Sequence, residues 1–385
     1  MKKKVYARIL DPFIELKNGS FFLFGPRGVG KSYLLRTVID QKKTFYINLL
    51  DSSLYFRLQR NPSELMDMII SKPVNQVVID EIQRIPELLN LVHLMIEEQE
   101  LKFILTGSSA RKLKRGQANM LAGRALSREL FPLTWSEIDD FNLKKYLQFG
   151  GLPSSYLSAN PDDFLNAYTN TYLKEEIQAE GLVKKLPAFS SFLSMAALSS
   201  GEQLNFANIS NEVGVSAVTI REYYSILEDT LLGFFVQPWV KSKKRKPIST
   251  AKFYFFDTGV RNTLAEIGTL DEKSNTWGQA FEHFIAMELR AFLSYKLKNK
   301  IKLCYWRSTS QFEVDFILGD AVAIEVKSAK KVQANFLKGL KALQEEGLVN
   351  KFYLVSNDPL EKVTDGVHCL PWQVFLEKLW SGKII

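Results

Sequence analysis

The feature that most constrains this chain is a short loop between two apolar segments, Gly25-Pro26-Arg27-Gly28-Val29-Gly30-Lys31-Ser32. It follows "SFFLF" (20–24), which is typical of a strand, and precedes a helical pattern from Ser32 to Asp40. Glycines let successive backbone N–H groups converge on phosphate oxygens, because no side chains lie in the way. The helix that follows adds its unpaired N–H groups and the positive end of its dipole. The loop therefore predicts a phosphate-binding turn at the end of a strand.

The same eight residues match the pattern G-x-x-x-x-G-K-[ST] in full. We expect the backbone of Gly25, Pro26, Arg27, Gly28, Val29 and Gly30 to surround the phosphates of ATP. Lys31 would reach the β- and γ-phosphates, and the Ser32 hydroxyl would ligate Mg²⁺. The alternative is a glycine-rich turn that matches by accident, which the flanking strand and helix make the weaker interpretation.

The segment "NQVVIDEIQ" (75–83) supplies a second element of such a site. Asp80 and Glu81 follow an apolar strand pattern, and a carboxylate at a strand end can hold Mg²⁺ beside Ser32. Glu81 would orient or deprotonate the attacking water. A solvated strand end explains the pattern equally well on its own, but its place after the phosphate loop favours the metal site.

The surrounding sequence predicts an α/β domain with a mostly parallel sheet. Nearly all-apolar strand patterns alternate with helical ones, as expected when helices cover both faces of a sheet. The predicted strands are "SFFLF" (20–24), "TFYINLL" (44–50), "QVVID" (76–80), "KFILTG" (102–107) and "ALSREL" (125–130).

Across almost its whole length, the chain resembles the AAA-superfamily ATPases of bacteria and archaea whose C-terminal half is a domain of unknown function. The resemblance implies an ATP-binding core, a winged-helix-like middle and a nuclease-like C-terminal fold. The matching stretches follow the family's order along almost the whole chain: "GPRGVGKS", "VVIDEIQ", "ILTGSSAR", "LAGRALSRELFPLTWSEI", "FGGLPSSYL", "VSAVTIREYYSILEDTLL", "KFYFFDTGVRN", "GQAFEHFIAMEL", "YWRSTSQFEVDFIL" and "AIEVKSA".

By the same resemblance, a polar residue after the strand 102–107 would lie between the acidic pair and the γ-phosphate. Ser108 or Ser109 fits this role, and we assign it to Ser108; an ordinary serine-rich turn is the alternative. Arg111, Arg115 and Arg124 lie downstream, and any of them could reach a γ-phosphate or be a surface charge.

The middle of the chain resembles a helix-turn-helix followed by a hairpin. A short helix is expected over 205–213 and a second one after Ser216, a plausible N-cap. Such a second helix can lie in the major groove of DNA. The hairpin turn carries five cations suited to phosphate contact, although a solvated turn or a protein-binding winged helix explains them equally well: Lys241, Lys243, Lys244, Arg245 and Lys246.

The C-terminal part contains the pattern "EVDFILGDAVAIEVK" (313–327). Asp315 and Glu325 on paired strands can share a hard cation, and Lys327, two residues after Glu325, projects from the same strand face. This arrangement looks like a PD-(D/E)xK nuclease site, in which Glu282 on the preceding helix is the usual extra carboxylate. A metal there would polarise a phosphodiester, with Lys327 steadying the developing charge. The alternative is a charged, solvated hairpin without a metal site.

Together these patterns predict an α/β protein in four parts. They are a P-loop ATPase core (1–135), a helical lid or linker (136–200), a winged-helix-like segment (201–262) and a restriction-endonuclease-like domain (275–385). We expect an ATPase with ATP and Mg²⁺ as cofactors, coupled to DNA binding or processing. The alternative is an ATP-gated interaction switch with an inert nuclease-like domain, and the oligomeric state stays open.

The composition of the chain bears on its partners and its cellular location. The formal net charge of +8 favours a polyanionic partner. No apolar run approaches the ~18 residues of a membrane span, and no signal core follows the basic N-terminus, so we expect a cytoplasmic protein without a membrane role. The two cysteines, Cys304 and Cys369, indicate neither a metal site nor a disulfide framework.

Overall fold

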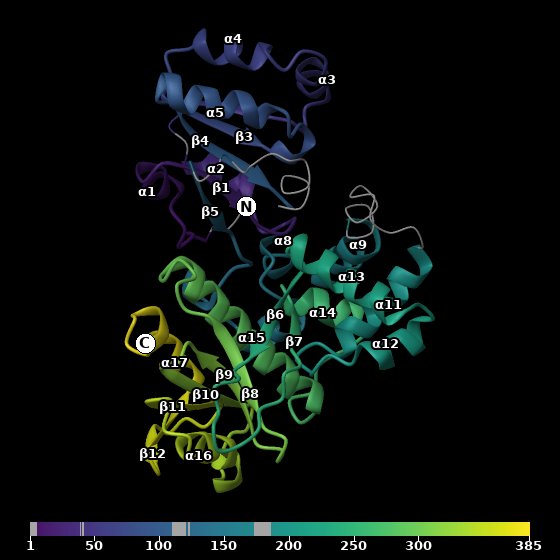
Figure 1. Ribbon diagram of the computed structural model, residues 1–385, viewed down its shortest axis with the longest axis vertical. Helices are drawn as coiled ribbons and strands as arrows, with labels where there is room; N and C mark the ends of the chain where they lie inside the picture. Colours follow the sequence, from purple (N-terminus) through teal and green to yellow (C-terminus); the bar gives the residue numbers. More distant parts are fainter. Residues whose placement is uncertain (1–5, 39, 41, 110–120, 122–123, 173–185) are drawn as a thin grey trace. The chain divides into compact units, whose positions relative to one another are not determined.

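The computed structural model describes residues 6–38, 40, 42–109, 121, 124–172 and 186–385, which form two compact units (Figure 1). The N-terminal unit comprises Ala7–Pro132 together with Ile226–Leu232. The C-terminal unit comprises Leu133–Ser225 and Gly233–Ile385 together with Tyr6. Helix α13, Ala217–Asp229, therefore contributes residues to both units.

The N-terminal unit is built on a five-stranded sheet in the order β2-β3-β4-β1-β5. All neighbouring strands pair in parallel, so their carboxyl ends meet at one edge. The predicted α/β block with a parallel sheet is confirmed. The strands are β1 (Ser20–Phe24), β2 (Thr44–Asn48), β3 (Gln76–Asp80), β4 (Lys102–Gly107) and β5 (Ala125–Glu129).

Helices complete this unit on the two faces of the sheet. Strand alternation sends Phe22 of β1 and Phe103 of β4 into one apolar core, which the buried side of α5 closes with Val92 and Met95. Each such side chain contributes roughly 1.5–3 kcal/mol on burial. The helical elements are α1 (Pro12–Lys17), α2 (Lys31–Val38), α3 (Ser52–Arg60), α4 (Glu64–Ile70), the 3₁₀ turn η1 (Ile82–Arg84) and α5 (Leu88–Gln99).

The C-terminal unit begins with a helical region. Its elements are the 3₁₀ turn η3 (Trp135–Glu137), α7 (Leu143–Phe149), α8 (Pro153–Tyr156), α9 (Pro161–Ala167), the π-helix η4 (Tyr168–Tyr172), α11 (Leu186–Leu198), α12 (Phe206–Val213), α13 and α14 (Thr258–Leu264).

Two predicted motifs, "FGGLPSSYL" and "KFYFFDTGVRN", meet inside this region. The buried Asp257 carboxylate accepts hydrogen bonds from the backbone N–H groups of Gly151 (2.8 Å), Leu152 (3.2 Å) and Val260 (3.1 Å). A Cβ at Gly150, where φ is +73°, would lie 1.9 Å from Asp257 Oδ1. The loop predicted at the two glycines is therefore held closed by a carboxylate that also caps α14.

The remaining chain forms an eight-stranded sheet in the order β12-β13-β11-β10-β9-β8-β6-β7. The predicted hairpin is present as the antiparallel pair β6 and β7, and β6 joins the larger sheet by pairing in parallel with β8. The strands are β6 (Gly233–Pro238), β7 (Lys252–Phe255), β8 (Leu303–Arg307), β9 (Glu313–Leu318), β10 (Val322–Lys327), β11 (Lys351–Ser356), β12 (Lys362–Thr364) and β13 (Val367–Pro371).

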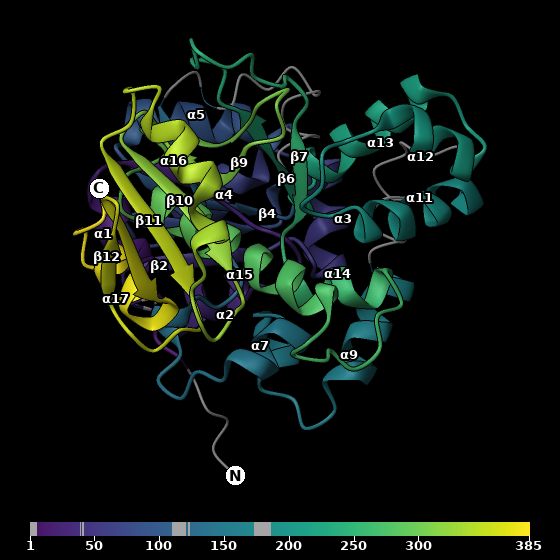
Figure 2. The ribbon, with the colours of Figure 1, turned by 90° about the horizontal axis from the view of Figure 1, so that it is seen from below.

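Helices cover both faces of this sheet. Helix α15 (Asn275–Tyr295) contributes Phe281, Phe284 and Leu289 to one apolar core. Helix α16 (Lys338–Gln344) contributes Leu340 to the other core and lies against β9 and β10 (Figure 2). The 3₁₀ turn η5 (Ala334–Leu337) precedes α16, and α17 (Trp372–Trp380) closes the unit.

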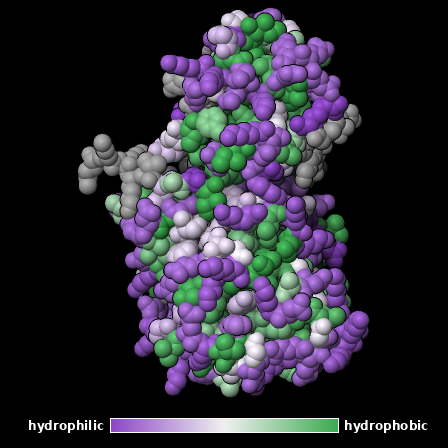
Figure 3. Space-filling model, turned by 90° about the vertical axis from the view of Figure 1, so that its left-hand side faces the viewer, coloured by the Kyte–Doolittle hydropathy of each residue, from purple (hydrophilic) through white to green (hydrophobic). Residues whose placement is uncertain are grey.

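On the face drawn in Figure 3, hydrophilic and hydrophobic side chains are interspersed. Among the described residues, the large apolar side chains that are most exposed include Phe56 and Ile70 of the N-terminal unit. Within the same residues, no helix has both the length and the apolar composition required to span a bilayer.

Candidate functional site

The loop predicted to bind phosphate lies at the carboxyl end of β1. Gly28 and Gly30 have φ values of +85° and +96°, which side-chain-bearing residues rarely adopt. A Cβ at Gly25 would lie 2.5 Å from the carbonyl oxygen of Leu130, so this position accepts only glycine. The Lys31 ammonium is buried and donates to the carbonyl oxygens of Gly25 (2.6 Å) and Pro26 (3.2 Å). The loop thus closes around its own lysine.

Asp80 lies at the same edge of the sheet, at the end of β3. Its carboxylate is buried and accepts hydrogen bonds from the hydroxyl groups of Thr106 and Tyr46. Burial and the neighbouring Asp80 charge raise the pKa of the Tyr46 phenol, so this donor keeps its proton. Because β1, β3 and β4 are parallel, Asp80 and the loop share one edge, as the sequence predicted.

Glu81 is held in an unusual backbone conformation next to Asp80. Its φ of +64° is in the left-handed region, and its backbone N–H donates to Thr106 Oγ1 (3.0 Å). The side-chain amide of Gln83 donates to Glu81 and also lies 3.2 Å from Ser108 Oγ. Gln83 therefore links Glu81 to Ser108, whereas Ser109 is buried and donates to the Asp229 carbonyl (3.5 Å).

Three residues of this site were not predicted from the sequence: Tyr46, Gln83 and Thr106. Gln83 lies in "DEIQ" and Thr106 in "ILTGSS", so both stand beside motifs that were recognised. Tyr46 carries no local signal, because only the pairing of β2 with β3 brings it to Asp80.

The arginines downstream are only partly described. Arg124 is exposed and forms an ion pair with Glu97, so it is held at the surface of α5. Arg111 and Arg115 lie outside the described residues. Arg8, which the sequence did not single out, donates to the carbonyl oxygens of Val29 (2.8 Å) and Phe131 (2.5 Å) and so supports the phosphate loop from behind.

The second predicted site lies on β9 and β10, where the antiparallel pairing places Asp315 opposite Glu325 beyond the pair Phe316–Ile324. Lys327 Nζ lies 2.5 Å from Glu325 Oε1 and 3.8 Å from Asp315 Oδ2. Asp315 Oδ2 also accepts from the backbone N–H of Val326 (2.8 Å). The three side chains that the sequence selected are thus in contact.

The charges of this cluster are strongly coupled. Burial and the adjacent Asp315 charge raise the pKa of the Glu325 carboxyl to about 8, although Lys327 opposes the shift. Burial would lower the pKa of the Lys327 ammonium, but Asp315 and Glu325 raise it overall. Glu325 Oε2 is buried and has no hydrogen-bond partner among the described residues. A buried, unpaired carboxylate oxygen is costly unless something else binds it.

That unpaired oxygen leaves the pair Asp315 and Glu325 able to hold Mg²⁺, which proteins commonly bind through one or two carboxylates while it keeps several waters. Within the described part of the chain, no three His, Cys, Asp or Glu side chains form a ready-made metal site. The donor set therefore fits a cation held by two carboxylates and water, and Glu282, the third predicted ligand, does not complete a three-carboxylate site with them.

Glu282 lies on α15 and is held by side chains that the sequence did not predict. Its Oε1 accepts from the Tyr254 hydroxyl (2.6 Å) and lies 3.4 Å from Lys252 Nζ. Burial raises the pKa of the Glu282 carboxyl, and Lys252 opposes the shift. The adjacent His283 is buried, bonds the Phe255 carbonyl (2.6 Å), and has its pKa lowered to about 3 by burial, so it is neutral and structural.

The basic turn between β6 and β7 contacts the strands and helix of the same unit. Lys241 pairs with Asp320 (2.6 Å), and Arg245 pairs with Glu345. The Glu346 carboxylate accepts from the backbone N–H groups of residues 243–245 (2.8–3.1 Å). The exposed cations of the turn are therefore Lys241, Lys243, Lys244 and Lys246.

The helix-turn-helix prediction corresponds to α12 and α13. The Ser216 hydroxyl accepts from the Thr219 N–H (3.1 Å), as an N-cap does. Tyr223 and Tyr224 of α13 pack edge-on against Phe189 and Phe192 of α11. The outer side of α13 carries Arg221 and Glu222, a set with little net charge.

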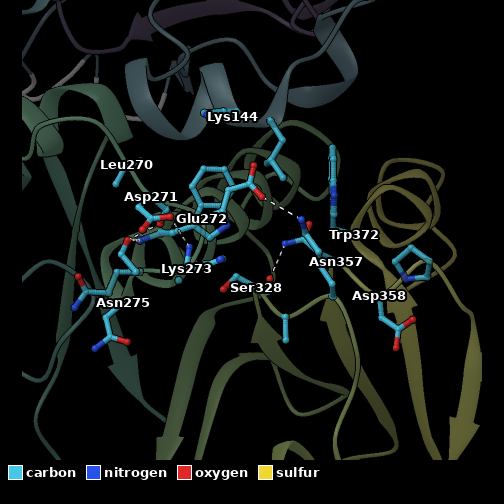
Figure 4. A pocket seen from close by; sticks show the side chains of 18 of the residues that line it. Lys144, Leu270, Asp271, Glu272, Lys273, Asn275, Ser328, Asn357, Asp358 and Trp372 are labelled. Atoms are coloured by element: carbon cyan, nitrogen blue, oxygen red, sulfur yellow. Dashed lines mark hydrogen bonds and ion pairs between the residues drawn. The ribbon is translucent and has the colours of Figure 1, made fainter.

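Two cavities of the C-terminal unit are lined by residues near the acidic cluster in sequence, but neither is lined by Asp315, Glu325 or Lys327. The larger, about 1570 Å³, lies at the carboxyl ends of β10, β11 and β13, where Figure 4 shows Ser328, Asn357 and Trp372. Its charged lining is balanced, with three lysines and three carboxylates: Lys144, Lys273, Lys330, Asp271, Glu272 and Asp358. The smaller, about 460 Å³, is lined by Lys252, Glu282, Arg307 and Glu313. Gln279, one turn before Glu282, lines both.

Comparison with family models divides the chain into three matches. Residues 17–139 match the model of an AAA domain. The N-terminal part of the chain is of the AAA type. Residues 140–271 match a domain of unknown function (DUF8612), and residues 277–375 match another (DUF4143). A loop of this type on a parallel sheet binds nucleotide, typically with Mg²⁺.

The chain is also similar to curated proteins. An uncharacterized protein of Mycobacterium tuberculosis is 26% identical over 65% of this chain, which spans 58% of that relative. An uncharacterized protein of Methanocaldococcus jannaschii is 23% identical over 93% of this chain and 88% of its own length. A solved structure of the replication initiator DnaA bound to AMPPCP and single-stranded DNA has a TM-score of 0.31 and 13% identity, over 56% of this chain and 85% of that one. A similarity this low indicates neither a shared fold nor a shared function.

Proposed function

We propose that the chain binds Mg-ATP at the loop 25–32, hydrolyses it with Glu81, and couples the reaction to DNA processing at Asp315, Glu325 and Lys327. The observation that carries the proposal is the shared sheet edge on which the loop, Asp80, Glu81 and Ser108 meet. The AAA-domain match over residues 17–139 supports the first half of it.

The residues of the N-terminal site divide the work of hydrolysis. Lys31, which donates to the carbonyl oxygens of Gly25 and Pro26, would donate to phosphate oxygens instead when ATP is bound. Ser32 and Asp80 would hold Mg²⁺, which would neutralise charge on the β- and γ-phosphates. Glu81 orients the water and accepts its proton, while Gln83 and Ser108 fix where that carboxylate stands.

Glu81→Gln tests hydrolysis separately from binding. Since the amide cannot accept the proton, we expect turnover of ATP to fall about 100-fold while binding stays within about twofold. Exposed Glu98 on α5 offers a matched control, because Glu98→Gln should change neither. Unchanged turnover in Glu81→Gln would remove Glu81 from this role.

The second half of the proposal concerns the acidic cluster. When bound, a divalent cation would polarise a phosphodiester. Asp315 and Glu325 would hold it, and Lys327 would stabilise negative charge on the phosphate oxygens. The exposed lysines of the β6–β7 turn would contact the DNA backbone.

Plasmid nicking tests this half. Wild-type protein with Mg²⁺, with and without ATP, is compared with Asp315→Ala and with Asp365→Ala, an exposed carboxylate that pairs with Lys341. We expect nicking in the wild type and in Asp365→Ala and its loss in Asp315→Ala.

A second candidate function, an ATP-gated interaction switch with an inert nuclease-like domain, has one observation in its favour. Lys327 already pairs with both carboxylates that would hold the cation. Wild-type inertness toward plasmid with Mg²⁺ and with Mn²⁺, in a protein that still hydrolyses ATP, would favour this switch.

A further inference from the structure

The acidic site of the C-terminal unit is assembled from two distant segments. Asp315 and Glu325 come from β9 and β10, within the stretch that matches one domain of unknown function. Lys252 and Tyr254 come from β7, within the stretch that matches the other. The site therefore crosses the boundary between two family models.

Both β7 side chains converge on one carboxylate oxygen. Residues two apart on a strand face the same side, so Lys252 and Tyr254 point together toward α15. There the Tyr254 hydroxyl donates to Glu282 Oε1 (2.6 Å), and Lys252 Nζ lies 3.4 Å from the same atom. Lys252 also pairs with Glu313 (2.8 Å), which Arg307 contacts in turn (3.3 Å).

The burial of Lys252 and Tyr254 is not explained by a gain in stability. Lys252 and Tyr254 are 4% and 1% exposed. A buried ion pair seldom stabilises a protein more than well-packed apolar residues of similar volume, because both charges must leave water. The arrangement does, however, fix the rotamer of Glu282. Glu282 Oε2 has no hydrogen-bond or ion-pair partner among the described residues, and Glu282 lines the 460 Å³ cavity.

We propose that Tyr254 and Lys252 are positioning residues, which hold Glu282 so that its second oxygen can accept a hydrogen bond from a water molecule on a divalent cation held by Asp315 and Glu325. This inference rests on the proposed function of the acidic site. Hydrogen-bond partners that orient the groups around a metal matter for its binding, and loss of such a partner typically weakens metal binding or activity about 10- to 100-fold.

The proposal also connects the site with the helix-turn-helix segment. The loop before α12 pairs with β7 through Gly201 N–H to Phe253 O (2.8 Å) and Leu204 N–H to Ala251 O (3.0 Å). Displacement of this loop would move the strand that carries Lys252 and Tyr254. The geometry of Glu282 is thereby tied to the segment that precedes the predicted DNA-binding helices.

Titration calorimetry of the full chain with Mn²⁺, without nucleotide, tests the proposal. The heat that disappears in Asp315→Asn is assigned to this site. Tyr254→Phe removes one hydroxyl and no charge, and we expect its Mn²⁺ affinity to fall about tenfold. Tyr353→Phe is the control, because Tyr353 is a buried tyrosine on β11 of the same sheet whose ring packs against His368 and, edge-on, against Phe375.

A double-mutant cycle shows whether Tyr254 acts through Glu282. In the Glu282→Gln background, Tyr254→Phe should cause no further loss of affinity. Lys252→Met provides a second variant if Tyr254→Phe unfolds, as judged by its melting temperature. We expect Lys252→Met to lower Mn²⁺ affinity when Glu282 is present and to cause no further loss in the Glu282→Gln background.

The outcomes separate this inference from the function on which it rests. Mn²⁺ binding that depends on Tyr254, in a protein that never nicks DNA, upholds the inference and overturns the nuclease proposal. Nicking and Mn²⁺ binding that are both insensitive to Tyr254→Phe and Lys252→Met overturn the inference alone. If the wild type binds no Mn²⁺ at Asp315, both are wrong.

Discussion

The two candidate sites hold their carboxylates in opposite ways. In the N-terminal unit, the donors to Asp80 and Glu81 are neutral: the hydroxyls of Thr106 and Tyr46 and the amide of Gln83. In the C-terminal unit, lysines contact Asp315, Glu325 and Glu282. Neutral donors orient a carboxylate and leave its charge to attract a cation, whereas a lysine neutralises it. In the proposed function, the first site would receive Mg²⁺ together with a polyphosphate, and in the second site a divalent cation would have to replace the Lys327 ammonium.

The largest effect expected from this contrast is at Lys31, the cation that the N-terminal site does provide. Lys31→Ala removes the point charge that faces the phosphates, and we expect ATP turnover to fall about 1000-fold. Lys42→Ala, an exposed lysine of the same unit, is the control and should leave turnover unchanged. A Lys31→Ala protein that binds ATP with wild-type heat would contradict the assignment of the loop.

Removing the lysine of the second site should also lower the stability of the fold. Lys327→Gln leaves Asp315 and the buried Glu325 without their cation, and because Lys327 is 35% exposed we expect a loss of about 2 kcal/mol in the free energy of unfolding at pH 7. Urea unfolding measures it. Lys330→Gln breaks an exposed pair with Glu272 and should cost less than about 0.5 kcal/mol. Equal losses in the free energy of unfolding would show that the Lys327 ion pairs stabilise the protein no more than the exposed pair of Lys330 and Glu272.

Removing a neutral donor from the first site gives the matching measurement. Thr106→Val deletes the hydroxyl that donates to buried Asp80 and accepts from the Glu81 N–H. We expect a loss of about 1.5 kcal/mol in the unfolding transition of the N-terminal unit. Thr37→Val on α2, whose hydroxyl bonds a carbonyl of its own helix, serves as the control. A loss no larger than that of the control would show that Asp80 does not depend on Thr106.

The last effect depends on pH and concerns Glu288, a deeply buried carboxylate that has only neutral donors. Glu288 accepts from the Trp135 N–H (2.7 Å) and the Trp380 indole (2.8 Å), and burial raises its pKa to about 8. The unfolded chain therefore releases this proton near pH 4.5 and the folded chain near pH 8. Between these values the folded state binds more protons, so stability falls as pH rises, by at most about 1.4 kcal/mol per pH unit.

Glu288→Gln removes this titration. The new amide group also places its own N–H donors opposite the Trp135 N–H or the Trp380 indole N–H, so one donor loses its acceptor. The variant should therefore have a lower melting temperature than the wild type at about pH 5. The difference in melting temperature should narrow toward about pH 8, because only the wild type loses stability over that interval. A constant difference across the interval would mean that Glu288 titrates normally.

Much of the first site could be predicted because its parts are local in the sequence. The loop 25–32 carries its own conformational requirements, and Asp80 follows an apolar strand whose end must lie at the same edge of a parallel sheet. Tyr46 could not be predicted, since nothing near it differs from an ordinary strand. The contacts of the two serines could not be predicted either, because only the structure shows that Gln83 donates to Ser108 and that Ser109 donates to the Asp229 carbonyl.

For the second site, the sequence determined the pair of strands and the contact among Asp315, Glu325 and Lys327, because alternation along a hairpin brings those side chains to one face. Only the tertiary structure decided that β6 and β7 extend this sheet and bring Lys252 and Tyr254 to Glu282. Strand patterns specify which face a side chain occupies, but not which strands become neighbours. That choice depends on the packing of distant segments around a common core, and here it adds residues to a site whose motif lies elsewhere in the chain.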